Sequence, residues 1–412
     1  MAATIPSWIV GLRGQCVKGV AWDEARDTLV FHCDRDRRFV PVDHRSGARG
    51  TVNRRLRREV QDLPIWGRSV TLSIEYCQLK IGASDRRMER LSFVEPGHGF
   101  TRRYARFISQ LARHMSIAVV ARYTGLAWRT VKAMDERALQ RDLPALDPGA
   151  LTGLRHLGVD EVARAKGHDY LTIVYDLDSG ALVWVTEGRS KAGLTALFDQ
   201  LDEPVAQGIE AVAMDMWAPF EAAVRQALPH AAVVFDRFHV MQQYSKVIDT
   251  VRRAEFKRAS AAGKEVLTGS RYLLLKNADH LSPNQAARLD QLLAVNGPLN
   301  AVYALKEQLQ QLWNASASIT VMGQRLDQWC ELANATGLAP MKRFVAMLQR
   351  HRSGICNYAA HPITTARLEG GHVAIGLIRK RARGLLDTDY FKLKIRQSAV
   401  PEPPLGLYAL TG

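Results

Sequence analysis

Apolar and polar positions alternate in two short segments near the start of the chain. Residues 28–31 and 70–74 are rich in β-branched side chains, which predicts two strands. Residues 101–114 instead place Tyr104, Phe107, Ile108 and Leu111 three and four positions apart, a spacing that predicts an amphipathic helix. The pattern thus indicates a β-containing region followed by a helical one.

The next segment, residues 116–137, predicts a pair of short helices joined by a turn. Ser116 can cap the first helix, Gly125 can turn the chain, and the small Ala121 and the apolar Val131 allow close packing. Ordinary helical hairpins also show this spacing, so a DNA-binding helix-turn-helix is one of two interpretations. Its second helix is expected to expose four side chains: Trp128, Arg129, Lys132 and Arg137.

A proline-punctuated linker at residues 142–149 separates this region from an alternating β and α pattern. We expect strands at 154–159, 170–175, 182–185, 211–214 and 232–235, and helices at 191–201 and 219–228. Three successive strands followed by helix, strand, helix and strand predict an α/β fold with a mixed sheet.

From about residue 246 to 360 the pattern predicts helices only, including a capping box at Ser282 and Gln285. A helical block between two α/β segments indicates an insertion. A last helix is expected from Thr364 and Thr365 towards Gly384, and the proline-containing tail is expected to be extended.

Composition and charge narrow the class of protein. The 412 residues are 47% hydrophobic and 24% charged, which excludes wholesale disorder and predicts two to four domains. The formal charge of +15 favours a polyanion, nucleic acid rather than membrane, and no apolar run reaches the ~18–20 residues of a membrane span. The five cysteines lie far apart and no signal peptide is evident, so we expect a cytoplasmic protein associated with chromosomal DNA.

A dense run of arginines occupies the region between the first two predicted strands. Arginine binds phosphate through two parallel hydrogen bonds, so this run suits a DNA backbone, although a solvated basic face is the plain alternative. The DNA-binding candidates there are Arg54, Arg55, Arg57 and Arg58.

The same region offers few donors for a structural zinc ion. His32, Cys33, His44 and Cys77 are its only plausible ligands, and their spacing does not fit the closely paired donors of a zinc module. We therefore expect a degenerate zinc-ribbon-like region without zinc.

Three carboxylates are candidates for chemistry. Asp160 and Asp215 are each expected directly after a strand, where α/β proteins gather their catalytic groups. Glu369 is expected on the last helix, ahead of four cations: Arg379, Lys380, Arg381 and Arg383. Two carboxylates on neighbouring strands repel each other, and Mg²⁺ would relieve that repulsion with oxygen ligands, Mn²⁺ being the alternative. Taken singly, each acid is equally explained as a helix cap or a surface ion pair.

These residues carry a resemblance to a known family. The segments LGVDE (157–161), MDMWAPF (214–220), VVFDRFHVMQQ (233–243), GSRYLLLKN (269–277), TTARLEGGHVAIGLIRKRARG (364–384) and YFKLKIR (390–396) resemble, in order, the DDE transposases of bacterial insertion sequences. The similarity is greatest to the ISL-three family. It implies an RNase H-like catalytic core with a helical insertion, an N-terminal DNA-binding region, and a metal-binding triad on Asp160, Asp215 and Glu369.

The resemblance also implies roles for neighbouring residues. Asp236 and His239 match a D-x-x-H element, which would bind a phosphate or nucleobase or orient the active site; the alternative is a buried pair that fixes a helix start. Trp217 could stack on a base or belong to the core. Where the family has Asn on either side of the Glu-Gly pair, this chain has Thr365 and His372.

The resemblance implies a domain order as well. It runs from a basic region (1–95) through a helix-turn-helix domain (96–146), the first part of the core (150–245), the insertion (246–360) and the final core helix (361–396) to an extended tail (397–412).

The sequence thus predicts a transposase that binds the terminal inverted repeats of its element. It would cut and join DNA, including a target DNA, by a two-metal mechanism, and would act as a homo-oligomer on DNA without a membrane partner. Two rivals stay open. One is an inactive DNA-binding regulator derived from a transposase, and the other is an RNase H-like nuclease or resolvase.

Overall fold

A computed structural model gives the chain's architecture. It describes residues 11–82, 85–147, 151–165, 169–314, 318–365, 369–382 and 387–402. The contacts divide the chain into a first unit, Met1–Pro144 with Leu377–Gly412, and a second unit, Ala145–Gly376. The sequence-based domain boundaries stay predictions. No helix among the described residues is long and apolar enough to cross a membrane.

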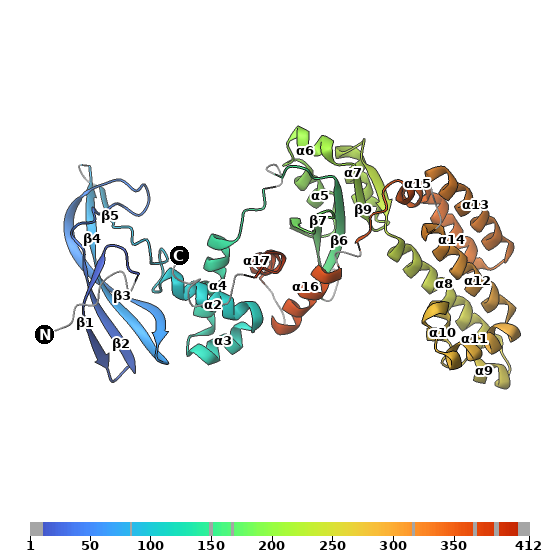
Figure 1. Cartoon of the computed structure of the whole chain (residues 1–412), viewed down its shortest axis with the longest axis horizontal. Helices are drawn as coiled ribbons and strands as arrows, with labels where there is room; N and C mark the ends of the chain where they lie inside the picture. Colours follow the sequence, from blue (N-terminus) through green and yellow to red (C-terminus); the bar gives the residue numbers. More distant parts are fainter. Residues whose placement is uncertain are drawn as a thin grey trace. The chain divides into compact units, whose positions relative to one another are not determined.

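The first unit begins with a twisted sheet (Figure 1). Its strands run β1 (Gln15–Asp23), β2 (Thr28–Arg35), β4 (Arg68–Ile81) and β3 (Thr51–Ile65), with β5 (Asp85–Met88) paired to β4. The predicted strands at 28–31 and 70–74 are confirmed as parts of β2 and β4. The arginine run lies on β3, which pairs with β4 from Thr51 to Ile65 and was not predicted because its arginines hide the alternation.

The predicted helix-turn-helix is present in this unit. Its helices are α2 (Arg102–His114), α3 (Ile117–Thr124) and α4 (Trp128–Asp142). Ser116 caps α3 by accepting a hydrogen bond from the Val119 amide at 3.2 Å, and Gly125 adopts a φ of 72° at the turn. Val131 is fully buried, as its predicted packing role requires.

The sequence pattern did not predict the last helix, α17. A single helix towards Gly384 was expected, followed by an extended tail from residue 397. Instead α16 (Glu369–Ala382) is followed by α17 (Thr388–Ala399), so residues 397–399 are helical. Asp387 caps α17 through the Tyr390 amide at 3.0 Å, a start signal that was overlooked.

Helix α17 packs on the helix-turn-helix through a buried polar cluster. The Asp135 carboxylate of α4 accepts hydrogen bonds from Ser109 at 2.6 Å, from Lys394 at 3.0 Å and from the Tyr390 hydroxyl. Lys394 also donates to the carbonyl of Ala112 at 3.1 Å. Burial lowers the pKa of Lys394 and raises that of Tyr390.

The second unit is built on a five-stranded sheet with the order β10-β9-β6-β7-β8. Its strands are β6 (His156–Ala165), β7 (Asp169–Asp176), β8 (Leu182–Glu187), β9 (Ala211–Met214) and β10 (Ala232–Phe235). Strands β6, β9 and β10 are parallel, whereas β7 and β8 run antiparallel to their neighbours. Helices α5 (Lys191–Phe198), α6 (Glu203–Gly208) and α7 (Ala218–Ala227) follow the strands. The predicted mixed α/β sheet is confirmed.

The bounds of the first predicted strand of this sheet were wrong. It was expected at 154–159, but β6 begins at His156 and continues to Ala165 by pairing with β7. Asp160 therefore lies inside a strand, opposite Ile173, rather than after its end. The polar residues that follow Val159 concealed this continuation.

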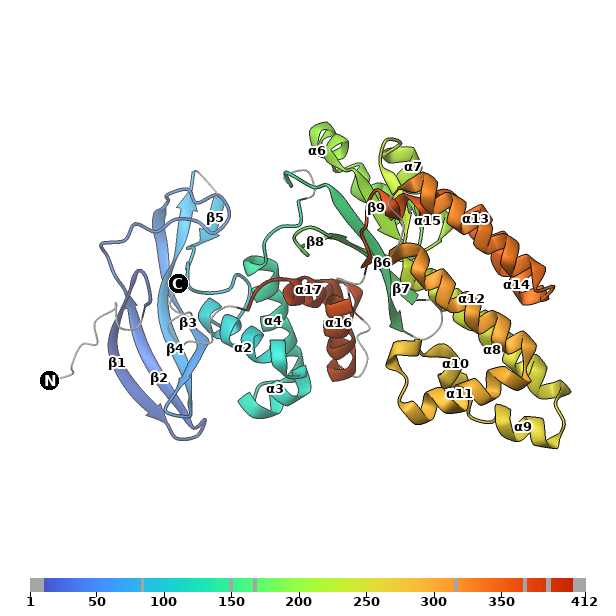
Figure 2. The ribbon, with the colours of Figure 1, turned by 45° about the vertical axis from the view of Figure 1, so that its right-hand side comes forward.

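The described part of residues 246–360 contains only helical elements, as predicted. They are α8 (Arg237–Arg258), α9 (Ala261–Leu267), α10 (Arg271–Leu275), η2 (Ala278–His280), α11 (Pro283–Val295), α12 (Gly297–Asn314), α13 (Ile319–Ala335), α14 (Ala339–Arg350), α15 (Arg352–Cys356) and η3 (Asn357–Ala359). The predicted capping box at Ser282 and Gln285 is confirmed. Figure 2 shows these helices beside the sheet of the same unit.

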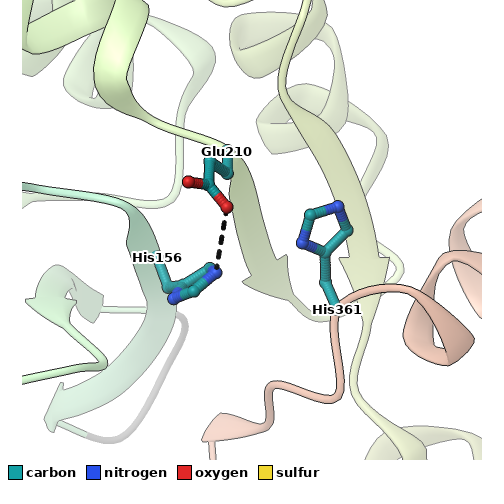
Figure 3. Close-up of side chains that lie close together, drawn as sticks. All are labelled: His156, Glu210 and His361. Atoms are coloured by element: carbon teal, nitrogen blue, oxygen red, sulfur yellow. Dashed lines mark ion pairs between the residues drawn. The ribbon is translucent and has the colours of Figure 1, made fainter.

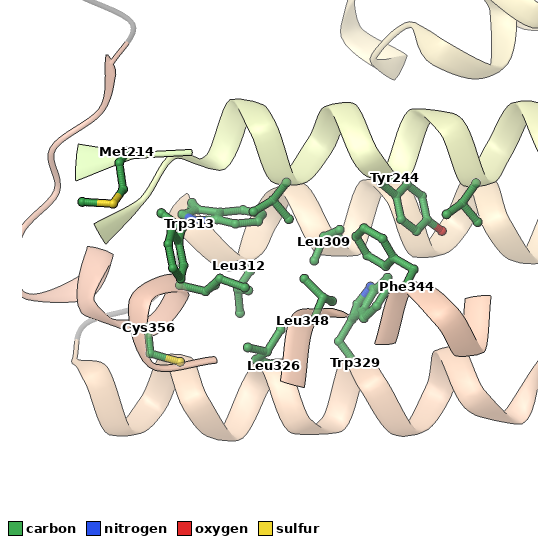
Figure 4. Close-up of a cluster of buried hydrophobic side chains, with 14 of the residues drawn as sticks. Met214, Tyr244, Leu309, Leu312, Trp313, Leu326, Trp329, Phe344, Leu348 and Cys356 are labelled. Carbon is green, nitrogen blue, oxygen red and sulfur yellow. The ribbon is translucent and has the colours of Figure 1, made fainter. Parts of the chain in front are cut away.

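The core of this helical block is continuous with the core of the sheet. Met214 of β9 and Trp313, Trp329 and Phe344 of the block belong to one apolar cluster (Figure 4). The Trp329 indole donates to the carbonyl of Leu305 at 2.9 Å, which satisfies its buried nitrogen. The block is therefore packed as part of the second unit.

The buried cluster around Asp135 predicts a large effect of removing its cation. Lys394→Met leaves a buried carboxylate without its counter-charge and should reduce the free energy of unfolding of the first unit by about 3–5 kcal/mol. Lys392→Met on the same helix removes an exposed pair with Asp389 and should change it by less than ~1 kcal/mol. Urea unfolding of both variants tests this, and equal effects would contradict the role given to Asp135.

Candidate active site

The registers of three parallel strands bring three aspartates to one edge of the second sheet. Gly158 pairs with Ala213, and Met214 pairs with Phe235. Continuing these registers places Asp160, Asp215 and Asp236 at equivalent positions on β6, after β9 and after β10. Adjacent strands lie about 4.8 Å apart, so three carboxylates are neighbours at the same edge.

Backbone amides are the direct hydrogen-bond partners of Asp160 and Asp215 at this edge. The Asp160 carboxylate accepts a hydrogen bond from the Glu161 amide at 2.7 Å, and Asp215 accepts one from the Met216 amide at 2.6 Å. Burial raises the pKa of the Asp160 carboxyl, although His372 and His239 oppose the shift. A cation at this edge would therefore be stabilised, and the hard carboxylate oxygens fit a divalent ion such as Mg²⁺.

Two histidines flank the carboxylates. His239 Nδ1 on α8 lies 3.8 Å from Asp215 Oδ1, and His372 Nε2 on α16 lies 3.6 Å from Asp160 Oδ2. His372 Nε2 is buried and has no hydrogen-bond partner among the described residues. Both distances exceed a direct hydrogen bond, so each imidazole is beside its carboxylate without being locked to it.

Asp236 has a structural function at this edge. Its buried carboxylate caps α8 by accepting from the Phe238 amide at 2.8 Å, and its other oxygen accepts from the amide of Thr365 at 3.0 Å and from the Thr365 hydroxyl. The alternative of a buried residue that fixes a helix start is therefore supported for Asp236. His239 instead lies beside Asp215, so the two members of the predicted D-x-x-H element contact different partners.

The sequence pattern did not identify Arg189 as a residue of this site. It follows β8 and pairs with Glu161, its Nη2 lies 3.7 Å from Asp215 Oδ2, and its guanidinium stacks 3.9 Å from the ring centroid of Trp217. The available signal was an arginine between a strand and a capped helix, the place where α/β folds gather functional groups. The stacking also occupies one face of Trp217, which is half-buried.

Helix α16 approaches the sheet because position 371 is glycine. A Cβ there would lie 2.7 Å from the Tyr175 hydroxyl of β7, and burial raises the pKa of that hydroxyl to about 12. Glu369 is the first residue of α16, one turn before His372 and on the same helix face, and its side chain lies outside the described atoms.

The predicted cations divide into exposed and internally paired groups. Arg129 and Arg137 are exposed on α4, whereas Lys132 is half-buried and pairs with Asp387, so its predicted exposure was wrong. On β3, Arg55 pairs with Glu75 and Arg57 with Asp34. In the same unit, two arginines donate to backbone carbonyls: Arg58 to His98 and Arg381 to Arg113. The remaining predicted cations differ in exposure, since Arg54 and Lys380 are exposed and Arg379 is half-buried. Arg383 lies outside the described residues.

Two cysteines of the basic region were the candidates for a zinc ligand. Cys33 and Cys77 are buried in the first unit's sheet, and burial raises the pKa of the Cys33 thiol to about 12. A thiol that resists ionisation is a poor metal ligand. The absence of N-terminal zinc stays a prediction.

Comparisons with known proteins identify the family of this chain. Residues 157–395 match a transposase family model, and residues 89–139 match the helix-turn-helix domain of transposase family ISL3. The chain is 34% identical over 394 residues to the transposase for insertion sequence element IS1001 of Bordetella parapertussis, covering 94% of this chain and 95% of that protein. It is 29% identical over 309 residues to the transposase for element IS1557 of Mycobacterium tuberculosis, covering 69% of each.

An α/β unit with clustered carboxylates, joined to a helix-turn-helix, therefore defines a transposase, an enzyme that cuts and transfers DNA. The chain belongs to the ISL3 transposase family, the family that its sequence segments resemble. It binds DNA through its helix-turn-helix domain.

The approach of α16 gives a test with a matched control. Gly371→Ala forces a Cβ against Tyr175 and should displace α16, lowering transposition about 100-fold. Gly370→Ala, whose Cβ meets nothing within 4 Å, should stay near the wild-type frequency. Adding Tyr175→Phe to Gly371→Ala removes the clashing hydroxyl and should restore much of the loss. A transposition assay in cells measures all three, and equal effects of the two alanines would refute the packing argument.

Proposed function

We propose that the second unit is an RNase H-like core that cuts and joins DNA with Asp160, Asp215 and Glu369 as its metal-binding triad. The observation that carries this proposal is the strand register, which makes Asp160 and Asp215 neighbours at one edge of the sheet. The position of Glu369 at the start of α16, one turn from His372, supports the third assignment.

Divalent metal use follows from the family, and we propose Mg²⁺, or Mn²⁺, as the ion. The triad would hold two such ions, one that would activate the attacking oxygen and one that would stabilise the leaving oxygen at phosphorus. The neighbouring side chains have their own tasks in this proposal. Arg189, held by stacking on Trp217, faces the carboxylate edge and would orient a DNA phosphate. His372 and His239 would adjust the charge at Asp160 and Asp215 respectively.

The reaction is an in-line displacement in which water first attacks the phosphodiester and a DNA 3′-hydroxyl later attacks the target strand. No covalent bond to the protein forms, so positioning and electrostatics supply the catalysis. Because two element ends must be processed together, we propose that the protein acts as a homo-oligomer on its terminal inverted repeats.

The triad assignment predicts a separation of cleavage from binding. Asp215→Asn and Glu369→Gln should each reduce Mg²⁺-dependent cleavage of inverted-repeat DNA by at least 1,000-fold, on the order of ~4 kcal/mol of transition-state stabilisation. DNA affinity should change less than about threefold, because these residues lie outside the helix-turn-helix domain.

Asp199→Asn, an exposed carboxylate after α5, is the matched control and should cleave normally. Cleavage assays with and without Mg²⁺ and gel-shift titrations read the two properties separately. Wild-type cleavage by Asp215→Asn would refute the triad, and repeat binding without any cleavage by the wild type would favour the inactive regulator. Cleavage without strand transfer would favour the nuclease.

The exposure of the α4 cations predicts different effects on DNA binding. Arg129→Ala should weaken binding to the inverted repeats by about 1–3 kcal/mol if it reads a base, or reduce the salt slope by about 1 if it binds a phosphate. Lys132→Ala should leave affinity nearly unchanged, because its ammonium already pairs with Asp387, and should instead destabilise the contact between α4 and α17. Salt titrations and thermal melts separate these results, and an equal loss of affinity in both variants would contradict them.

A further inference from the structure

Three side chains that could bind a metal ion lie close together in the second unit. They lie at the amino ends of the parallel strands, opposite the ends that carry the aspartates. His156 begins β6, Glu210 precedes β9, and His361 follows η3. The nearest ligand atoms of the three side chains all lie within 4.8 Å of one another, and His156 Nε2 is 3.8 Å from Glu210 Oε2. Figure 3 shows the three side chains converging from three separate segments. Within the described residues this is the one such group of His, Cys, Asp or Glu.

A hydrogen bond from the ring of His156 to Asp178 fixes the orientation of its imidazole. Its Nδ1 lies 2.9 Å and 3.0 Å from the two oxygens of Asp178. An ionised carboxylate can only accept, so Nδ1 carries a proton, and in the neutral imidazole the lone pair is then on Nε2, the nitrogen nearer Glu210. A carboxylate behind a histidine is the usual outer partner of metal-binding imidazoles.

Glu210 forms an exposed ion pair with Arg155. Arg155 donates to its two oxygens at 2.8 and 3.1 Å, and both side chains are exposed, so the pair contributes little stability and can open. Ligand atoms around a tetrahedral ion stand about 3.4 Å apart when the bonds are roughly 2.1 Å long. The three side chains would therefore move together by up to about 1.4 Å on binding an ion, and His156 and Glu210 already lie 3.8 Å apart.

We propose that His156, Glu210 and His361 form a second metal site, distinct from the carboxylate triad, that binds Zn²⁺ or a similar borderline divalent ion. Two imidazoles and one carboxylate favour such an ion over Mg²⁺, which prefers oxygen ligands. His156 precedes Asp160 by four strand residues, or about 13 Å, so the same ion cannot serve both edges.

The site would join three parts of the chain that are distant in sequence. His361 lies in the segment that returns from the helical block, and Thr365 of the same segment is bonded to Asp236 at the other edge. The ion would therefore hold this segment near the start of β6 and β9, four residues before it reaches Thr365. The segment leads on to Glu369, and a role for the ion in positioning that residue rests on the function proposed above. Metal binding itself does not rest on it.

Zinc binding to the full-length, untagged protein after chelator treatment tests the proposal. Isothermal titration with ZnCl₂ should give one saturable site that persists in Asp215→Asn, which removes a triad carboxylate. His361→Ala and His156→Ala should weaken it at least 10-fold, and Asp178→Asn should weaken it about 10-fold without abolishing it. His280→Ala, which removes an exposed histidine of η2, is the matched control and should bind as the wild type does.

Two further readouts keep the test independent of transposition. A saturating excess of zinc should raise the melting temperature of the wild type by about 5–10 °C and that of His361→Ala much less. Co²⁺ in the site should give visible absorption bands that His361→Gln removes, while circular dichroism verifies that the variant is folded. Zinc affinity that His361→Ala leaves unchanged, or zinc binding that disappears in Asp215→Asn, would overturn the proposal, as would the absence of binding by the wild type.

Discussion

Electrostatic repulsion at the carboxyl edge of the second sheet is the constraint on which the rest of this unit depends. The registers of β6, β9 and β10 align Asp160, Asp215 and Asp236, and such an arrangement is unfavourable unless each charge finds a partner. The chain satisfies Asp236 completely, through the α8 amides and Thr365. Asp160 and Asp215 have near neighbours instead: His372 lies 3.6 Å from Asp160, and the Arg189 guanidinium and His239 lie 3.7 and 3.8 Å from Asp215. None of these side-chain contacts is a direct hydrogen bond, so both carboxylates keep oxygens that could bind a cation.

Asp236 also explains how a long helical block fits into an α/β unit without disturbing this edge. The block starts with α8, which Asp236 caps, and its return segment ends on the same carboxylate through Thr365, 129 residues later. One side chain thus makes hydrogen bonds at both the start and the end of the helical block. The block's core is fused to the sheet's core, where Gly354 of α15 leaves room for Phe235 and a Cβ would lie 2.4 Å from that ring. The start and the end of the block are therefore both held by contacts within the second unit.

The sequence predicted the parts of this fold that rest on local pattern. Buried strands such as β9 and β10, the cap at Ser116 and the helical block all have short-range signals, and these predictions are confirmed. The misses combine a weak or overlooked local signal with contacts to distant residues: strand β3 and the extension of β6 form by pairing with β4 and β7, and α17 packs on α4. The same holds for Arg189, whose significance comes from Trp217 and Asp215 across the fold, and for Lys132, whose partner Asp387 is 255 residues away.

Net charge alone would have misplaced the DNA-binding surface. Much of the arginine run on β3 is neutralised by its own sheet, since Arg55 and Arg57 pair with Glu75 and Asp34. Exposed pairs of this kind exchange readily with a phosphate, so they can add affinity that depends on salt without reading sequence. Base recognition instead requires a donor that is exposed and fixed on a rigid element, and Arg129 at the start of α4 meets both conditions because Val131 anchors that turn in the core. Affinity and specificity are thus expected to reside on different elements of the same unit.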